Sequence, residues 1–326
     1  MKRSALWLAT AALTLFTAGS ALADKLVLYT SQPNTDAQQT VDAFMAANPG
    51  TEVEWVREGT TKLMAKLMAE IEAGQPGADV LLIADTVTLE AIKRDNQLMA
   101  YKSPEAANYD AALYDADGFY YSTKMITTGI MYNTGAAMKP ASWKDLTKPE
   151  AKGLIRMPSP LTSGAALIHA AALTGMSDFG WDYYQALKDN ETQAGGGNGD
   201  VLKAVASGEK AYGVVVDYVA IREKAKGAPV EFVFPAEGVS VVTEPVAILS
   251  TTKNPDAAKK FVDFLLSEEG QKLVVSQGYI PARNGTELPA GYPARSEIKL
   301  LPFDAAAALA NAEANKAKFA EIFGAE

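Results

Sequence analysis

The residues that open one apolar helix have the chemistry of an anion site. Thr162-Ser163-Gly164-Ala165 precedes an alanine-rich run, so we expect free backbone N–H groups and the Ser163 hydroxyl at the positive end of the helix dipole. Such a helix terminus holds phosphate or phosphonate without a formal positive charge. The same residues are typical of an ordinary N-cap, so the segment by itself leaves both interpretations open. Thr60-Thr61, which opens another helix, and Asn198, in a glycine-rich turn before a third, could add further donors.

Three carboxylates are expected near the same crevice: Asp85 at a strand end, Asp217 beside Tyr218, and Glu244 in a β-rich passage. A site for simple phosphate would not favour them, because like charges about 4 Å apart repel strongly in a desolvated cleft. A zwitterion with one anionic and one ammonium end would suit both groups of residues. Each acid taken alone is equally well explained as a hinge or surface carboxylate.

The sequence disfavours catalysis. It has no cysteine, which removes thiol nucleophiles, thiolate metal sites and disulfides from consideration. The single histidine, His169, follows Ser163 by six residues on the same expected helix, so the two side chains point to different faces and form no Ser-His-Asp triad. We interpret His169 as a packed helix residue. The glycines at 195–197 and 199 lack the spacing of a dinucleotide-binding loop, and the sequence has no Walker A motif.

The elements that would position these residues alternate between strand and helix. Short apolar runs at 25–29, 52–56 and 79–83 predict buried strands, and apolar residues at helical spacing predict helices between them. A β-α-β-α-β order implies an open, mostly parallel sheet with helices on both faces. Ligands bind such sheets beyond the carboxyl ends of the strands, where Ser31-Gln32, Thr60-Thr61 and Asp85-Thr86 fall.

Two β-rich passages, 119–133 and 239–250, enclose a second unit with its own strands and helices. After 250 the sequence predicts further helices, ending in an alanine-rich helix over 304–323. The chain is therefore expected to leave one lobe, build another and return. Two strands crossing between lobes would form a hinge with the ligand cleft beside it.

The N-terminus and the charge balance bear on location and partners. Residues 1–23 have the three parts of a cleavable signal peptide: basic Lys2 and Arg3, an apolar stretch over 5–18, and the triplet Ala21-Leu22-Ala23. We therefore expect export to the periplasm. A formal net charge of −9 disfavours nucleic acid and anionic membranes as partners, so an anionic ligand would have to be held by local groups.

Several segments have a familiar pattern. They are LVLYTSQ, ADVLLIAD, SWKDLTKPEAKGLIRMPSP followed by TSGAA, AGGGNG, GEKAYGVVVDY and NPDAAKKFVDFLLSEEGQKLVVSQGYIPAR. Together they resemble the type II periplasmic binding proteins, in the branch of ferric-ion, phosphonate and organophosphate binders, and 2-aminoethylphosphonate-binding proteins above all. The resemblance implies an α/β fold of two lobes, 24–125 with 247–326 and 126–246, each a mostly parallel sheet flanked by helices and joined by two hinge strands.

The resemblance also implies a role. It predicts a monomeric receptor of an ABC importer that closes on a small ligand, docks to a membrane permease, catalyses nothing and needs no cofactor. Iron carriers in this branch use a histidine, a glutamate and two consecutive tyrosines. The matching positions here are Pro33, Ala84 and the pair Tyr218-Val219, so three of four ligands are missing and no metal site is expected.

At the matched family position, the segment at Ser163 becomes the expected anion site, and 2-aminoethylphosphonate is the expected ligand. Ser163, Gly164, Ala165, Thr60 and Thr61 would hold the phosphonate, while Asp217, Asp85 or Glu244 would hold the amine. Tyr218 would wall the pocket and donate its hydroxyl, and Ser31, Gln32, Thr86 and Asn198 complete the predicted site. The alternatives are a sugar phosphate, ferric ion, a polyamine or thiamine-like cation and, remotely, a periplasmic hydrolase.

Overall fold

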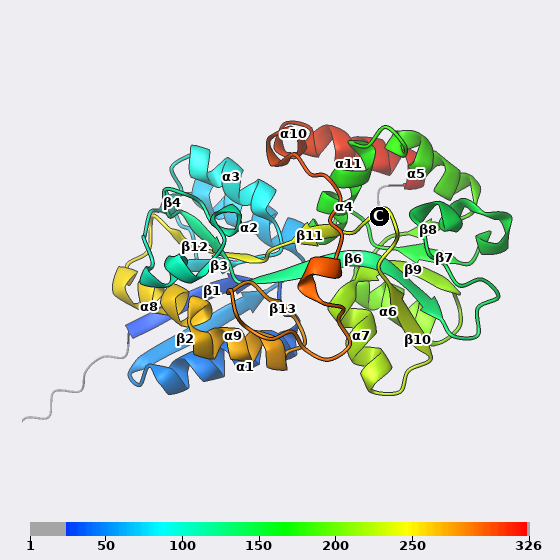
Figure 1. Ribbon diagram of the computed structural model, residues 1–326. Coiled ribbons are helices and arrows are strands. Elements are labelled where there is room, and N and C mark those ends of the chain that lie inside the picture. Colours follow the sequence, from blue (N-terminus) through cyan, green and yellow to red (C-terminus); the bar gives the residue numbers. More distant parts are fainter. Residues whose placement is uncertain (1–23, 325–326) are drawn as a thin grey trace, which may run out of the picture.

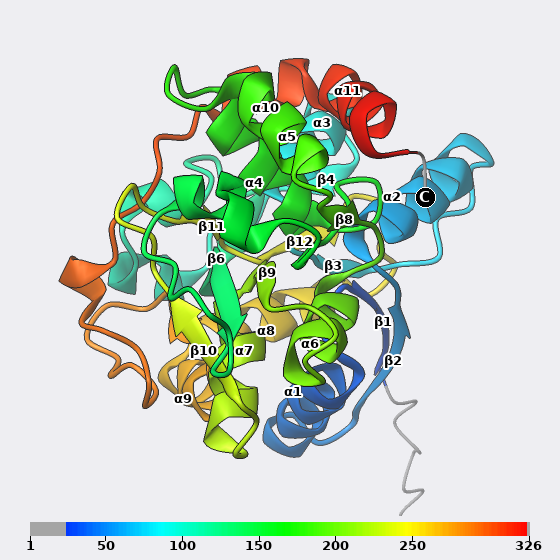
Figure 2. The same ribbon diagram turned by 90° about the vertical axis from the view of Figure 1, so that its right-hand side faces the viewer.

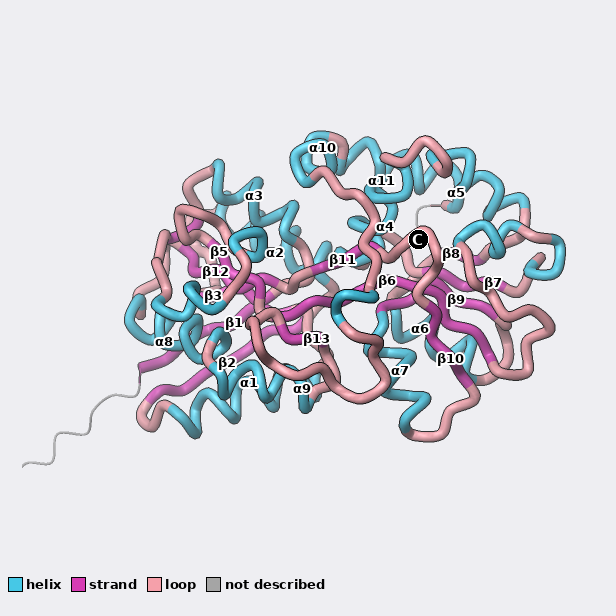
Figure 3. The backbone as a smooth tube through the Cα atoms, viewed as in Figure 1, coloured by secondary structure: helices cyan, strands magenta, loops and turns pink. Residues whose placement is uncertain are grey.

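The computed structural model describes residues 24–324, which form two lobes side by side (Figure 1). Long strands run from one lobe into the other, and helices cover both faces of each sheet (Figure 3). The expected signal peptide lies outside the described residues. Within 24–324, no helix has the length and apolar character needed to cross a membrane.

The first lobe is built on a six-stranded sheet with the order β2-β1-β3-β12-β4, and β5 pairs with β12. Strands β1, β2 and β3 are parallel, whereas β12 runs antiparallel to its neighbours. The apolar runs become strands because both faces are covered by helices: β3 is buried along its whole length. The strands are β1 (Asp24–Thr30), β2 (Thr51–Arg57), β3 (Val80–Leu82), β4 (Leu98–Met99), β5 (Tyr120–Ser122) and β12 (Pro245–Leu249). The helices are α1 (Asn34–Ala47), α2 (Thr60–Glu72), α3 (Thr86–Arg94), α8 (Pro255–Leu266) and α9 (Glu268–Ser276).

The second lobe has a sheet with the order β10-β6-β9-β7-β8, to which β11 and β13 add by pairing with β6. Only β7 pairs in parallel, with β8 and β9, while every pair that β6 makes is antiparallel. The strands are β6 (Lys124–Asn133), β7 (Ile155–Met157), β8 (Gln193–Ala194), β9 (Tyr212–Val216), β10 (Val230–Val233), β11 (Ser240–Val242) and β13 (Ile280–Pro281). The helices are α4 (Gly164–Thr174), α5 (Gly180–Asp189), α6 (Asn198–Ala206) and α7 (Asp217–Ala225). Short 3-10 turns cover Pro104–Asn108, Ala111–Leu113, Trp143–Thr147, Pro149–Ala151 and Arg295–Glu297.

Two crossing segments join the lobes, as the β-rich passages predict. The first runs from β5 into β6 and the second from β11 into β12. They pair with each other on both sides of the crossing, Tyr121 with Val246 and Thr127 with Val241. The Thr123 hydroxyl donates to the Glu244 carbonyl, 2.7 Å away, and so ties them at the middle. The two-lobed α/β fold is confirmed, but the sheets are mixed because each crossing strand enters its sheet against the direction of the βα units.

The end of the chain crosses once more, contrary to the assignment of all of 247–326 to the first lobe. Leu300 pairs with Val239, and the last helices, α10 (Ala305–Ala310) and α11 (Ala312–Phe323), follow. Helix α10 lies between α3 and α4, while α11 packs on α4 and α5 of the second lobe (Figure 2). Phe319 lies in that lobe's core, with its ring 5.9 Å from that of Tyr184. The aromatic residues of α11 need an apolar surface, and the second lobe supplies it.

We predict that Phe319→Ala lowers the free energy of unfolding by about 3 to 4 kcal/mol, because it leaves a cavity in the core of the second lobe. Phe319 is 2% exposed, whereas Phe303, in the segment that leads to α10, is 39% exposed. Phe303→Ala is therefore the matched control and should change stability by less than about 0.5 kcal/mol. Urea unfolding followed by circular dichroism measures both. Equal effects of the two substitutions would contradict the placement of α11.

Candidate ligand-binding site

A cleft of about 570 Å³ lies between the lobes, beside the crossing segments. Loops after β1, β2 and β3 form one wall, and the segments that open α4, α6 and α7 form the other. The crossing segments contribute Ile126 and Glu244. The lining residues include Ser31, Arg57–Thr60, Lys62, Ala84, Thr162–Ala165, Gly196–Asp200, Val216, Tyr218 and Val219.

Helix α4 points its N-terminus into the cleft. Ser163 is the N-cap, and its hydroxyl oxygen accepts a hydrogen bond of 3.3 Å from the Ala166 N–H. The N–H groups of Gly164 and Ala165 belong to the first turn, where no intrahelical acceptor exists, so they are available to a ligand. The Ser163 hydroxyl proton is available too, because in the cap the oxygen acts only as acceptor. An anion here would gain hydrogen bonds and the favourable end of the dipole.

Two further helices begin at the same cleft. Thr60 is the first residue of α2 in the opposite lobe, and Asn198 is the first residue of α6. The Asn198 side-chain oxygen accepts from the Val216 N–H at 3.2 Å, which fixes the amide and leaves its NH₂ group to donate. Three helix N-termini therefore face one cavity from both lobes, and at the start of α6 the Asp200 carboxylate already accepts from the Gly197 N–H at 2.9 Å.

Two basic side chains also line the cleft, and neither was predicted. Arg57 ends β2, and its Nε donates to the Gln32 carbonyl at 3.0 Å, so the guanidinium is held at the wall. Lys62 lies in the first turn of α2. Their proximity to Thr60 in the sequence is the signal that could have found them. They add positive charge, although Glu58 and Asp200 line the same cleft.

The floor of the cleft contains a buried ion pair. The Lys124 ammonium lies 2.5 Å from the Glu244 carboxylate, and the side chains are 1% and 3% exposed. Lys124 also lies 4.1 Å from the centre of the Tyr279 ring, and Gln32 donates to Glu244 at 3.4 Å. Burial raises the pKa of Glu244, and the attraction of Lys124 opposes that rise. Lys124 was missed because the sequence around it predicts only a strand.

The structure separates the predicted site residues into two groups. Eight line the cleft: Ser31, Thr60, Ser163, Gly164, Ala165, Asn198, Tyr218 and Glu244. Five do not: Gln32, Thr61, Asp85, Thr86 and Asp217. Gln32 is buried against Glu244, whereas Thr61 and Thr86 lie in the first turns of α2 and α3.

Asp85 and Asp217 lie in the protein interior, which corrects their prediction as ligands of an amine. Asp85 caps α3 and accepts from the backbone and the hydroxyl of Thr88. Asp217 accepts from the Thr127 N–H at 3.0 Å and from its hydroxyl at 2.7 Å. Burial raises the pKa of Asp217 to about 6. Each acid stands where a strand turns into a helix, so the polar groups of the chain itself take its oxygens.

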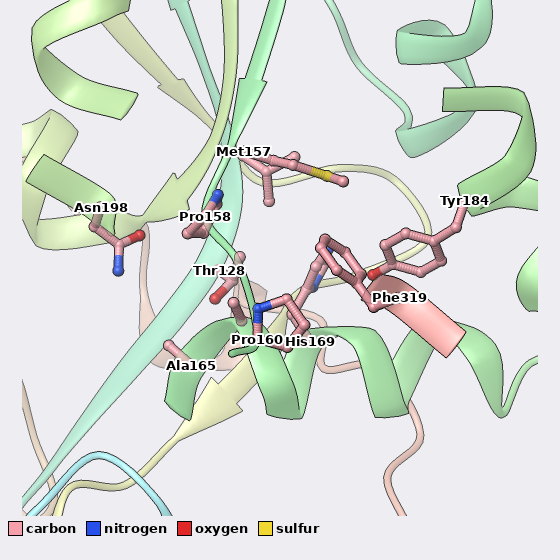
Figure 4. Close-up of a pocket in the computed structure, with 11 residues that line it drawn as sticks. Thr128, Met157, Pro158, Pro160, Ala165, His169, Tyr184, Asn198 and Phe319 are labelled. Atoms are coloured by element: carbon pink, nitrogen blue, oxygen red, sulfur yellow. The ribbon is translucent and has the colours of Figure 1, made fainter. Parts of the chain in front are cut away.

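His169 is a packed residue, as its position in an alanine-rich helix indicated. It is 5% exposed, its Nδ1 lies 3.0 Å from the Ser240 hydroxyl, and its ring centre lies 4.5 Å from that of Trp143. Figure 4 shows its ring beside a small cavity between α4, Tyr184 and Phe319. Burial lowers the pKa of His169 to about 3. Within 24–324, no group of three or more His, Asp or Glu side chains is placed to hold a metal ion.

We predict that burial of His169 makes the protein less stable as the pH falls. The unfolded chain takes up a proton near pH 6.5, but folded His169 does so only near pH 3, so its contribution is present above pH 6.5 and is lost as the pH falls toward 3. At pH 5 the loss is about 2 kcal/mol. His169→Gln should lose about that much less than the parent between pH 7.5 and 5 in urea unfolding. The chain has one histidine, so an equal loss in both proteins would contradict this assignment.

The fold and the interlobe cleft define a class, the two-lobed solute-binding proteins. The model of the family "Bacterial extracellular solute-binding protein" matches residues 39–299, and the chain belongs to this family. Homologues of this kind bind solutes and are not enzymes.

Individual relatives differ in what they bind. A probable ABC transporter periplasmic-binding protein of Sinorhizobium fredii is 27% identical over 267 residues, 78% of this chain and 73% of the relative. The structure of the periplasmic binding protein AfuA from Actinobacillus pleuropneumoniae, with fructose-6-phosphate bound, is 25% identical with a TM-score of 0.84 over 93% of this chain and 99% of that one. Iron-bound HitA from Pseudomonas aeruginosa is also 25% identical, with a TM-score of 0.79 over 91% and 99%.

Proposed function

We propose that this protein is the periplasmic receptor of an ABC importer and captures a small solute that bears a phosphate or phosphonate group. The observation that carries the proposal is the convergence of three helix N-termini, α2, α4 and α6, with Arg57 and Lys62 on one cleft. The names of the relatives support the transport role. A cleft of about 570 Å³ suits a small organic solute.

The anionic end of the solute would lie against α4. In this arrangement the Gly164 and Ala165 N–H groups, the Ser163 hydroxyl and the Asn198 amide donate from one lobe, while Thr60 and Arg57 act from the other. Because the donors come from both lobes, the anion can stabilise the closed arrangement of the cleft.

The opposite end of the solute would face Glu244 and Tyr218. For 2-aminoethylphosphonate, the ligand expected from the sequence, Glu244 would accept the ammonium group. It is the one member of the predicted acid trio that lines the cleft. A second candidate, a sugar phosphate, is favoured by the ion pair with Lys124, because a carboxylate whose charge is already balanced can accept hydrogen bonds from sugar hydroxyls without needing a cation from the ligand.

The ligand class is tested by calorimetry on mature protein refolded to remove carried ligand. 2-Aminoethylphosphonate, glucose 6-phosphate, inorganic phosphate and ferric citrate are titrated in parallel. We expect stoichiometric binding of one of the two organic ligands. Inorganic phosphate should bind more weakly, because it contacts only the anion-binding end of the cleft at the N-terminus of α4. Binding of ferric citrate alone would overturn the proposal.

We predict that Ser163→Ala raises the dissociation constant of the phosphate or phosphonate ligand about tenfold. This factor corresponds to the loss of one charge-assisted hydrogen bond of about 1.4 kcal/mol. The substitution also removes a helix cap. Ser267→Ala is the matched control, because Ser267 caps α9 in the same way, accepting from the Gly270 N–H, outside the cleft wall. Equal affinities of the two variants would place the anion elsewhere.

We predict that Glu244→Gln discriminates between the two organic ligands. It removes the charge that an ammonium group needs, so affinity for 2-aminoethylphosphonate should fall at least tenfold, while affinity for glucose 6-phosphate should change less than about threefold. Lys124→Met with Glu244→Gln keeps the buried floor free of an unpaired charge and serves as the control for damage to the hinge. A uniform loss for both ligands in the double variant would indicate such damage.

A further inference from the structure

The lobes meet through backbone contacts at the edge of the cleft. A Cβ atom placed on Gly59 of the first lobe would lie 2.7 Å from the Thr162 carbonyl oxygen of the second. One placed on Gly164 of the second lobe would lie 2.4 Å from the Ala84 carbonyl oxygen of the first. Real Cβ atoms do not approach oxygen so closely, so glycine is required at both contacts. The lobes are therefore closed upon each other.

An ion pair connects the lobes outside the cleft. Asp36 lies in the first turn of α1 in the first lobe, and Arg222 lies in the last turn of α7 in the second. The Arg222 guanidinium holds the carboxylate with both terminal nitrogens, at 3.0, 3.0 and 3.3 Å. The side chains are 6% and 24% exposed for Asp36 and Arg222, so water screens the pair only in part. The Tyr279 hydroxyl donates to the same carboxylate.

This pair stands directly behind the wall of the ligand cleft. Tyr218 lines the cleft, and its ring centre lies 4.5 Å from that of Tyr279. The Arg222 guanidinium lies 4.6 Å and 4.4 Å from the centres of these two rings. Neither Asp36 nor Arg222 lines the cleft itself. Helix α7 thus presents Tyr218 to the cleft at its start and Arg222 to the other lobe one turn later.

We propose that Asp36 and Arg222 form an interlobe latch that stabilises the closed conformation in the absence of ligand and so sets affinity without touching the solute. The partners belong to different lobes, so hinge opening separates them, and each charge returns to water. The attraction therefore acts on the closed state alone. The apparent dissociation constant equals the intrinsic one divided by the fraction of ligand-free protein that is closed. Weakening the latch therefore raises the apparent dissociation constant of every ligand by the same factor.

The latch is tested first without ligand, so that the result does not depend on which solute the protein binds. Because the chain has no cysteine, Glu72→Cys on α2 and Lys203→Cys on α6 place one spin label on each lobe. Double electron–electron resonance should show, in the protein with the latch intact, a population with a short distance between the two labels, which is the closed conformation. Asp36→Asn and Arg222→Gln should each reduce that population at least fivefold, and the double variant should reduce it no further.

The control is Glu54→Gln, which breaks the exposed Lys25–Glu54 pair within the first lobe and should leave the distances unchanged. Unfolding midpoints identify any variant that fails to fold. Short distances that persist in a folded Asp36→Asn variant would overturn the latch, and so would a parent with no short-distance population. Once a ligand is found, both latch variants should bind it about tenfold more weakly, with faster dissociation.

Discussion

The site depends on one constraint, which is that the first N–H groups of a helix have no acceptor within the helix. In a βα unit these groups face the carboxyl end of the preceding strand. Two such lobes placed face to face point several sets of unsatisfied donors at the same space. Helices α2, α4 and α6 do so here, and the crossing segments hold the two sets opposite each other. The cleft is therefore a consequence of the topology, before any charged side chain is considered.

The electrostatics follow from the same arrangement. The protein carries a formal net charge of −9, so an anion approaches it against the overall field. Backbone dipoles and the side chains of Arg57 and Lys62 put positive charge at the cleft, which Glu58 and Asp200 oppose. On the cleft floor, Lys124 neutralises Glu244 rather than leaving it free. Under the proposed function, the helix N-termini form the donating end of the cavity and Glu244, paired with Lys124, forms the accepting end, which would suit a solute with an anionic end and a polar remainder.

The fold was predictable from sequence because its signals are local. Buried strands appear as short apolar runs, helices as apolar stripes, and the crossing segments as β-rich passages that interrupt the alternation. The positions of Ser163 and Thr60 were predictable for the same reason, because the start of a helix can be recognised from a few consecutive residues. Asp85 and Asp217 were misplaced because a carboxylate at a strand end can turn inward to cap its own chain. Lys124 and Arg222 find their partners 120 and 186 residues away in sequence, and no local pattern records such pairs.

The two glycine contacts give closure a fixed end point. Gly59 meets the Thr162 carbonyl and Gly164 meets the Ala84 carbonyl, with backbone against backbone on both sides. Flexible side chains at a contact can change rotamer and let the lobes move closer, but main-chain atoms in contact cannot move aside. The lobes therefore stop at one separation, and the enclosed space has a set size. A solute too large for the enclosed space would keep the lobes apart. The protein would therefore select ligands by length as well as by charge.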